Sequence, residues 1–187
     1  MRKCMVYTRF DGGVDVCHPT PEIIRWLGCG GFWGKRPPGW YDAQVESQVA
    51  EGVAPDAARR YVRAMILGGC TTAEALEIIR DRDCSHLGTA IELWDAADVP
   101  TDRWFRDAWR RSANGGPISI SLKLARPIQF QHINFAFEAA IKRRSADLEA
   151  FDIPLDVDLH VLRQRILAAR EEIELRSVWP EQLVVRH

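Results

Sequence analysis

The sequence predicts an α+β protein that is mostly helical, with a small antiparallel sheet, several short helices and a C-terminal antiparallel helical hairpin. Three observations predict this class. Residues 3–18 alternate like two strands around a tight turn, residues 43–84 repeat apolar side chains at short helical spacing, and a longer helical period begins at residue 122. We expect a small α+β domain over residues 1–121, including a helical cluster over 43–84, then a helical hairpin over 122–177 and a tail over 178–187.

The composition is that of a folded protein with almost no net charge. The chain has 187 residues, of which 47% are hydrophobic and 27% charged, and a formal net charge of -1. Such a charge provides no general attraction to nucleic acid or to an anionic membrane. The odd number of five cysteines, the absence of a signal-like start and the lack of a long apolar run indicate a soluble protein of a reducing cytoplasm.

The first third of the chain predicts a hairpin followed by helices. Asp11-Gly12 is a preferred turn pair for the hairpin over residues 3–18, and Pro19 and Pro21 open a helix over 22–27. The Gly-, Pro- and Trp-rich residues 28–42 predict a loop. Helices follow over 43–51 and 55–67, and Thr71 begins a capping box with Glu74 that starts another helix.

The middle of the chain predicts two strands and a helix between them. Residues 88–93 and 118–121 are suited to strands that pair with the N-terminal hairpin. Between them, apolar and arginine side chains fall on opposite faces at helical spacing, and residues 114–117 provide an end signal. The apolar face is formed by Trp104, Phe105, Ala108 and Trp109. We expect this helix to cover the sheet.

The C-terminal third predicts two long helices. An apolar stripe begins at Leu122, where Pro127 requires a late start or a kink, and residues 151–154 end the first helix. The second helix is expected over 156–175. It carries a heptad seam formed by Leu159, Leu162, Ile166, Ala169 and Ile173. This seam closes either on the first helix or on a second copy of the chain, which would make a homo-oligomer.

The motifs that could indicate catalysis or ligand binding are weak. A P-loop requires a glycine where Cys29 stands and a hydroxyl where Arg36 follows Gly34-Lys35, and the dinucleotide pattern from Gly28 fails at Trp33. The scattered Cys and His residues lack the two-residue gap of a zinc knuckle, which favours buried thiols. Those residues are Cys17, His18, Cys29, Cys70, Cys84 and His86. The sequence therefore predicts no catalytic, cofactor or metal residues, and no enzyme.

The best candidates for binding are aromatic and arginine side chains. Trp33 and Trp40 could pin their loop or contact a protein partner, because aromatic residues anchor interfaces. Four arginines of the expected central helix could bind a partner or the phosphates of a nucleic acid, although Asp102 and Asp107 oppose phosphate binding. These are Arg103, Arg106, Arg110 and Arg111.

One segment resembles a known group of proteins. Residues 95–129, DAADVPTDRWFRDAWRRSANGGPISISLKLARPIQ, are similar to a family of small, mostly uncharacterised proteins of tailed bacteriophages and prophages. Those proteins pair a D-R-x-F-R-x-A-W helix with a short strand and a helical hairpin. Residues 8–16 and 177–183 resemble the ends of the same proteins, whereas Pro127 departs from their pattern. The resemblance implies a viral origin and supplies no activity or site residues.

These observations together predict a non-enzymatic bacteriophage protein that acts through protein contacts. We expect a minor virion or assembly component, found in the bacterial host cytoplasm or in the virion, with no membrane partner. Two alternatives stay open. One is a host-takeover factor that inhibits a bacterial defence complex, and the other is an accessory protein that binds nucleic acid.

Overall fold

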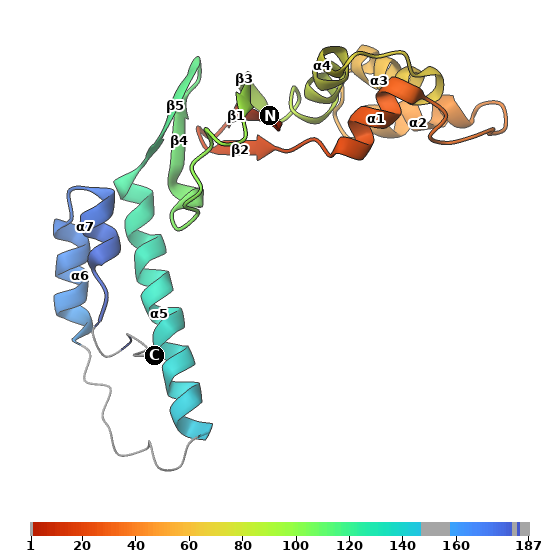
Figure 1. Cartoon of the computed structure of the whole chain (residues 1–187). Coiled ribbons are helices and arrows are strands. Elements are labelled where there is room, and N and C mark those ends of the chain that lie inside the picture. The colour runs from red at the N-terminus through yellow and green to blue at the C-terminus, as the bar shows by residue number, and fades with distance from the viewer. Residues whose placement is uncertain (1, 147–157, 181–182, 184–187) are drawn as a thin grey trace. The chain divides into compact units, whose positions relative to one another are not determined.

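A computed structural model describes residues 2–146, 158–180 and 183, which form an α+β fold that is mostly helical (Figure 1). The predicted fold class is thereby confirmed. The chain forms two compact units. Unit 1 contains residues 1–101 and 110–118, and unit 2 contains residues 102–109 and 119–187. This division differs from a boundary at residue 121, because residues 102–109 belong with the C-terminal helices.

The sheet of unit 1 has three antiparallel strands in the order β2-β1-β3. Strands β1 (Lys3–Arg9) and β2 (Val14–Cys17) form the predicted hairpin, and β3 (Gly88–Asp95) pairs with the other edge of β1. The hairpin turn is stabilised by the Asp11 carboxylate, which accepts from the backbone of Gly13 over 2.8 Å. Gly12 has a φ of +79° there, a conformation that glycine adopts without steric cost.

The four helices predicted in unit 1 are present. They are α1 (Pro21–Cys29), α2 (Trp40–Ala50), α3 (Pro55–Leu67) and α4 (Thr72–Asp83). Helix α2 begins at Trp40, within the residues 28–42 that were predicted as a loop. The predicted capping box is confirmed, since Thr71 and Glu74 bond reciprocally at the start of α4. The core of this unit joins strand and helix side chains, among them Met5, Leu27, Met65 and Ile79.

The predicted central helix is wrong. Residues 106–108 form a single 3-10 turn, and Trp109 begins strand β4 (Trp109–Ser112), which pairs with β5 (Gly115–Ile120). The side chains of Trp109 and Arg111 are buried, which is the two-residue period of a strand. Ala113-Asn114 is thus a hairpin turn and not a helix end, and Gly115, which begins β5, has a φ of +92°.

The pairing predicted for the second short strand is also wrong. Strand β5 belongs to the two-stranded β4-β5 sheet and not to the sheet of the N-terminal hairpin. A local partner was available because β4 replaced the expected helix. Closing a tight turn costs less chain entropy than a distant pairing.

Unit 2 is built on α5 (Leu122–Ala146), along which α6 (Leu159–Ala168) runs back (Figure 1). Helix α5 begins at Leu122 and continues through Pro127. The prediction that Pro127 delays the start of this helix is therefore wrong. The expected end of this helix at residues 151–154 lies outside the described residues. The single second helix is wrong as well, because α6 stops at Ala168 and α7 (Glu172–Ser177) follows as a separate helix.

A buried glutamine connects the parts of unit 2. Gln129 of α5 is fully buried, accepts from the indole nitrogen of Trp104 over 2.7 Å and donates to the carbonyl of Val178 over 2.9 Å. Trp104 also contacts Trp179 at 5.9 Å between ring centroids. Residues 178 and 179 of the expected tail therefore pack with the helical body.

Candidate partner-binding site

Trp33 and Trp40, the two predicted aromatic contact residues, lie in one chain of touching rings in unit 1. Trp33 is 5.2 Å from Trp40, 5.9 Å from Phe32 and 6.4 Å from Tyr61, measured between ring centroids. These edge-to-face contacts are the favoured geometry of aromatic pairs. Trp33 and Trp40 are half-buried, whereas Phe32 is 45% exposed. The rings thus hold the loop against α2 and α3 and also present an aromatic surface.

The glycines of this loop allow two backbones to cross. Gly30 has a φ of +71°, and a Cβ there would lie 2.5 Å from the backbone nitrogen of Gly68. Beyond the crossing, Gly31 and Phe32 donate to the carbonyls of Ile66 and Met65 over 2.9 and 3.2 Å. The close approach explains the glycine at position 30 without a bound phosphate.

The loop between α1 and α2, residues 30–39, is called the aromatic loop below. It borders a cavity of about 520 Å³, which we call the Trp33 cavity. Its wall combines aromatic, amide and charged side chains from the loop, α2, α3 and the end of α4. The lining residues that matter below are Phe32, Trp33, Gln48, Glu51, Arg82 and His86. The volume falls within the range of about 300–1,000 Å³ that is typical of ligand sites.

Two buried polar atoms of the lining residues have no hydrogen-bond partner within the part of the chain that the structure describes. They are Oε1 of Gln48 and Nδ1 of His86. Most buried polar atoms of native proteins are paired, because an unpaired one has lost its water without compensation. Both atoms are also inaccessible to solvent, so they lie behind the surface of the cavity and are not available to a group that enters it.

The positive charge in the wall is already neutralised. Arg82 pairs with Asp83 through Nε and Nη2, which form one edge of its guanidinium, with 2.8 Å between Nη2 and Oδ2. The guanidinium also lies 3.7 Å from the ring centre of Tyr61. Burial opposes the charge of Arg82, but the hydrogen bonds that Arg82 donates to Asp83 and the charge of that carboxylate outweigh burial and hold the pKa of Arg82 above its ordinary value.

The four predicted arginines do not form one surface. Arg103 and Arg106 are exposed, and the guanidinium of Arg103 lies 4.8 Å from the ring centre of Trp109. Arg110 is half-buried beside the Gly13 bridge. The prediction that Arg111 meets a partner is wrong, because its side chain has no exposed area.

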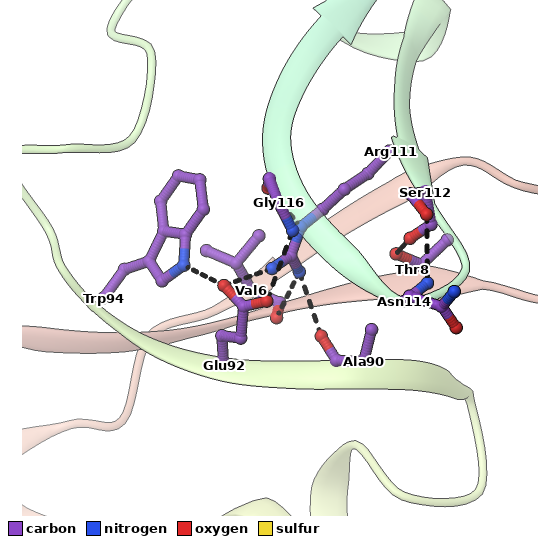
Figure 2. Close-up of polar contacts among 9 residues, drawn as sticks. All are labelled: Val6, Thr8, Ala90, Glu92, Trp94, Arg111, Ser112, Asn114 and Gly116. Carbon is purple, nitrogen blue, oxygen red and sulfur yellow. Dashed lines mark hydrogen bonds and ion pairs between the residues drawn. The ribbon is translucent and has the colours of Figure 1, made fainter.

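Arg111 instead joins three strands of unit 1 (Figure 2). Its guanidinium donates to the carbonyls of Val6 and Ala90, each over 3.0 Å, and to that of Gly116 over 2.7 Å. It also pairs with the carboxylate of Glu92. Sequence reasoning missed this role, since only the strand period of Trp109 and Arg111 could have indicated a buried arginine.

Glu92 is held by a second contact. The indole of Trp94 donates to its carboxylate over 2.8 Å, and this bond, followed by the Gly116 amide and Arg111, keeps the pKa of Glu92 below its ordinary value.

Of the cysteine and histidine candidates, the structure brings Cys17 and Cys84 together. The hydrogen bond between their thiol groups lowers the pKa of Cys17 and raises that of Cys84. Burial also raises the pKa of Cys84. Within residues 2–146, 158–180 and 183, no three His, Cys, Asp or Glu side chains gather as a metal site would require.

The predicted heptad seam is divided between core and surface. Leu162, Ile166 and Ala169 are buried in the core of unit 2, whereas Leu159 is 45% and Ile173 79% exposed. The interruption between α6 and α7 separates Ile173 from the other four. Three seam residues therefore pack within their own chain.

Comparisons with protein-family models, with curated proteins and with solved structures found no match. Among the helices that the structure describes, none combines the length and the apolar character that crossing a membrane requires.

Proposed function

We propose that this chain is a non-enzymatic bacteriophage protein that binds another protein through the aromatic loop and the Trp33 cavity of unit 1. The phage origin rests on the resemblance of residues 95–129 to phage and prophage proteins. The binding role rests on the structure of the loop. We place its action in virion assembly, either in the host cytoplasm or in the virion.

The observation that carries the binding role is an exposed aromatic ring on a backbone that is held in place. Phe32 is 45% exposed, yet its amide is bonded to Met65 and its ring contacts both Trp26 and Trp33. The same loop is held at Gly34, whose carbonyl accepts from the Tyr41 hydroxyl over 3.0 Å. A pre-ordered aromatic surface binds with little loss of entropy, which is the property of an interface hot spot.

Affinity purification of the tagged full chain from infected bacteria, followed by mass spectrometry, tests the proposal. We expect a protein partner that is retained by wild type and lost by Phe32→Ala. The matched control is Phe10→Ala, which removes an exposed phenylalanine from the hairpin turn of the same unit and should retain the partner.

The identity of the captured protein separates the functional alternatives. Head or tail proteins support an assembly role, and a bacterial defence complex supports host takeover instead. Equal recovery by wild type and Phe32→Ala contradicts binding through the loop. Capture of nucleic acid alone, in a form that weakens as salt rises, would support the accessory-protein alternative.

A further inference from the structure

We infer that Cys17 and Cys84 form a reversible disulfide on reaction with a hydroperoxide, and that this bond fastens strand β2 to the end of helix α4. The inference goes beyond the proposed function, because the reaction takes place within unit 1 and requires no partner protein. Three observations lead to it. The two thiol groups are in contact, their backbones are held in place, and they differ in exposure to solvent.

The two thiols come from distant parts of the sequence and meet at one core. Cys17 is the last residue of β2, and Cys84 directly follows the last residue of α4. A hydrogen bond joins their side chains. Cys84 is part of the core of unit 1, and Cys17 packs against the same core. A disulfide brings its sulfur atoms to about 2.0 Å, so side chains that are already in contact have only the last part of this distance to close.

The backbone on both sides of the contact is fixed. Cys17 lies opposite Met5 in the pairing of β1 with β2. The amide of Cys84 donates to the carbonyl of Arg80 over 3.0 Å, and the carbonyl of Cys84 accepts from the amide of Leu87 over 3.0 Å. Two groups that a fold holds together react far faster than the same groups on separate molecules. The disulfide is therefore expected within one chain and not between two.

Exposure and acidity give the two thiols different roles. Cys17 is partly exposed, whereas Cys84 has no exposed area. The hydrogen bond with Cys84, together with the charge of Arg82, outweighs burial and the charge of Asp83 and keeps the pKa of Cys17 below its ordinary value. The thiolate is the form that attacks an oxidant, so Cys17 reacts first. Cys84 lies in position to attack the product, which is the role of a resolving cysteine.

The reaction proceeds in two balanced steps. The Cys17 thiolate attacks the terminal oxygen of the hydroperoxide, and the O–O bond breaks. The departing oxygen takes a proton from solvent and leaves as an alcohol, or as water if the oxidant is hydrogen peroxide, and Cys17 becomes a sulfenic acid. The Cys84 sulfur then attacks the Cys17 sulfur, the S–O bond breaks, and the hydroxyl group leaves with the Cys84 proton as water. Two electrons have passed to the peroxide, and two molecules of a small thiol such as glutathione restore them.

Mass spectrometry of the full-length reduced protein after treatment with equimolar hydrogen peroxide tests this inference. Thiols that remain are blocked with N-ethylmaleimide, and the protein is digested without a reducing agent. We expect a cross-linked pair of peptides that joins Cys17 to Cys84, with the mass of two hydrogen atoms lost. Glutathione should remove this cross-link.

Cys70→Ser is the matched control. Cys70 is partly exposed like Cys17, but burial raises its pKa, so its thiol should react with peroxide more slowly. The Cys70→Ser variant should therefore form the cross-link to the same extent as wild type.

Substitution of each member of the pair separates their roles. Cys17→Ser changes a partly exposed residue and should abolish the cross-link, leaving Cys84 as a thiol. Cys84→Ala keeps a small apolar side chain at the buried position and should leave Cys17 as a sulfenic acid that dimedone traps. Wild type should yield far less of the dimedone product, because Cys84 consumes the sulfenic acid. Circular dichroism checks that each variant is folded, and equal dimedone yields would contradict the role of Cys84.

The bond should also restrain unit 1. Oxidised wild type should unfold at a higher temperature than reduced wild type, because the cross-link limits the unfolded chain. Cys17→Ser, treated in the same way, should show no such difference. Absence of the cross-link, a disulfide that involves other cysteines, a bond only between two chains, or a lower unfolding temperature of the oxidised protein would overturn the inference.

Discussion

Arg111 donates a hydrogen bond to the backbone carbonyl of Val6 over 3.0 Å, although the two residues are 105 positions apart (Figure 2). The β4-β5 hairpin is thereby attached to the central strand of the three-stranded sheet. A buried arginine that satisfies backbone carbonyls from three strands is a structural residue, and it removes one cation from any surface that could bind phosphates.

Replacing Arg111 should destabilise unit 1 strongly. Arg111→Met keeps much of the side-chain volume but leaves the carbonyls of Val6, Ala90 and Gly116 and the carboxylate of Glu92 without their donor. We expect a loss of about 3 kcal/mol in the free energy of unfolding, measured in urea. Arg106→Met, at an exposed position of the same segment, should cost less than about 0.5 kcal/mol. Similar losses in both variants would contradict the assigned role.

The pair of Glu92 and Trp94 should make stability depend on pH. The pKa of Glu92 is lower in the folded protein than its ordinary value of 4.5, so its contribution to stability is complete above that value and is lost as pH falls through the folded pKa. Wild type should therefore lose more stability than Glu92→Gln between pH 5 and about pH 3. Parallel unfolding curves of the two proteins across this range would count against the contact.

The backbone crossing at Gly30 should tolerate no side chain. In Gly30→Ala the new Cβ would lie 2.5 Å from the Gly68 nitrogen and from the Leu67 carbonyl carbon, so the loop must move. We expect a loss of about 3 kcal/mol by thermal or urea unfolding. Gly31→Ala has a similar φ of +75° but meets nothing within 4 Å, and should cost about 1 kcal/mol. A smaller effect at Gly30 than at Gly31 would show that the two backbones do not cross closely.

The thiol pair should react unequally. Because its bond to Cys84 lowers the pKa of Cys17, Cys17 should be alkylated by iodoacetamide near neutral pH, while buried Cys84 should stay unmodified. Peptide mass spectrometry of the folded protein measures both sites. Cys84→Ala should slow the reaction of Cys17, and an unchanged or faster rate would refute the proposed contact.

The divided seam should respond to truncation in two ways. Leu162→Ala leaves a cavity in the core of unit 2 and should cost about 3 kcal/mol of unfolding free energy. Ile173→Ala removes a side chain that is 79% exposed and should cost less than about 0.5 kcal/mol. Urea unfolding of both variants measures these losses of unfolding free energy. A large loss for Ile173→Ala would indicate that a second copy of the chain covers this residue.

Local signals predicted most elements of unit 1 correctly. The turn at Asp11-Gly12, the capping box at Thr71 and Glu74, and the apolar period of residues 55–67 each depend on residues within one or two turns of backbone. The central segment failed for the opposite reason. The spacing of Trp104, Phe105, Ala108 and Trp109 suits a helix, but burial of Arg111 against strands β1 and β3 outweighs this local preference.

The candidate site was predicted only in part. Trp33 and Trp40 were identified as contact residues from their loop, and the structure places Trp33 in the wall of the Trp33 cavity and Trp40 against the ring of Trp33. Gln48 and Glu51 carried no sequence signal and His86 was considered only as a weak zinc candidate, because an amide, a carboxylate and an imidazole in separate segments form no motif. Arg111 was misplaced, since an arginine is expected at the surface unless its partners are known.

The sequence by itself determined the mostly helical α+β class, the N-terminal hairpin and the caps of the short helices, because these features follow from side-chain period and turn chemistry. Only the tertiary structure decided that residues 109–120 form a hairpin, that Arg111 is buried, and that Gln48 and His86 line one cavity. Those outcomes depend on hydrogen bonds and packing between residues far apart along the chain, and no local pattern records such contacts.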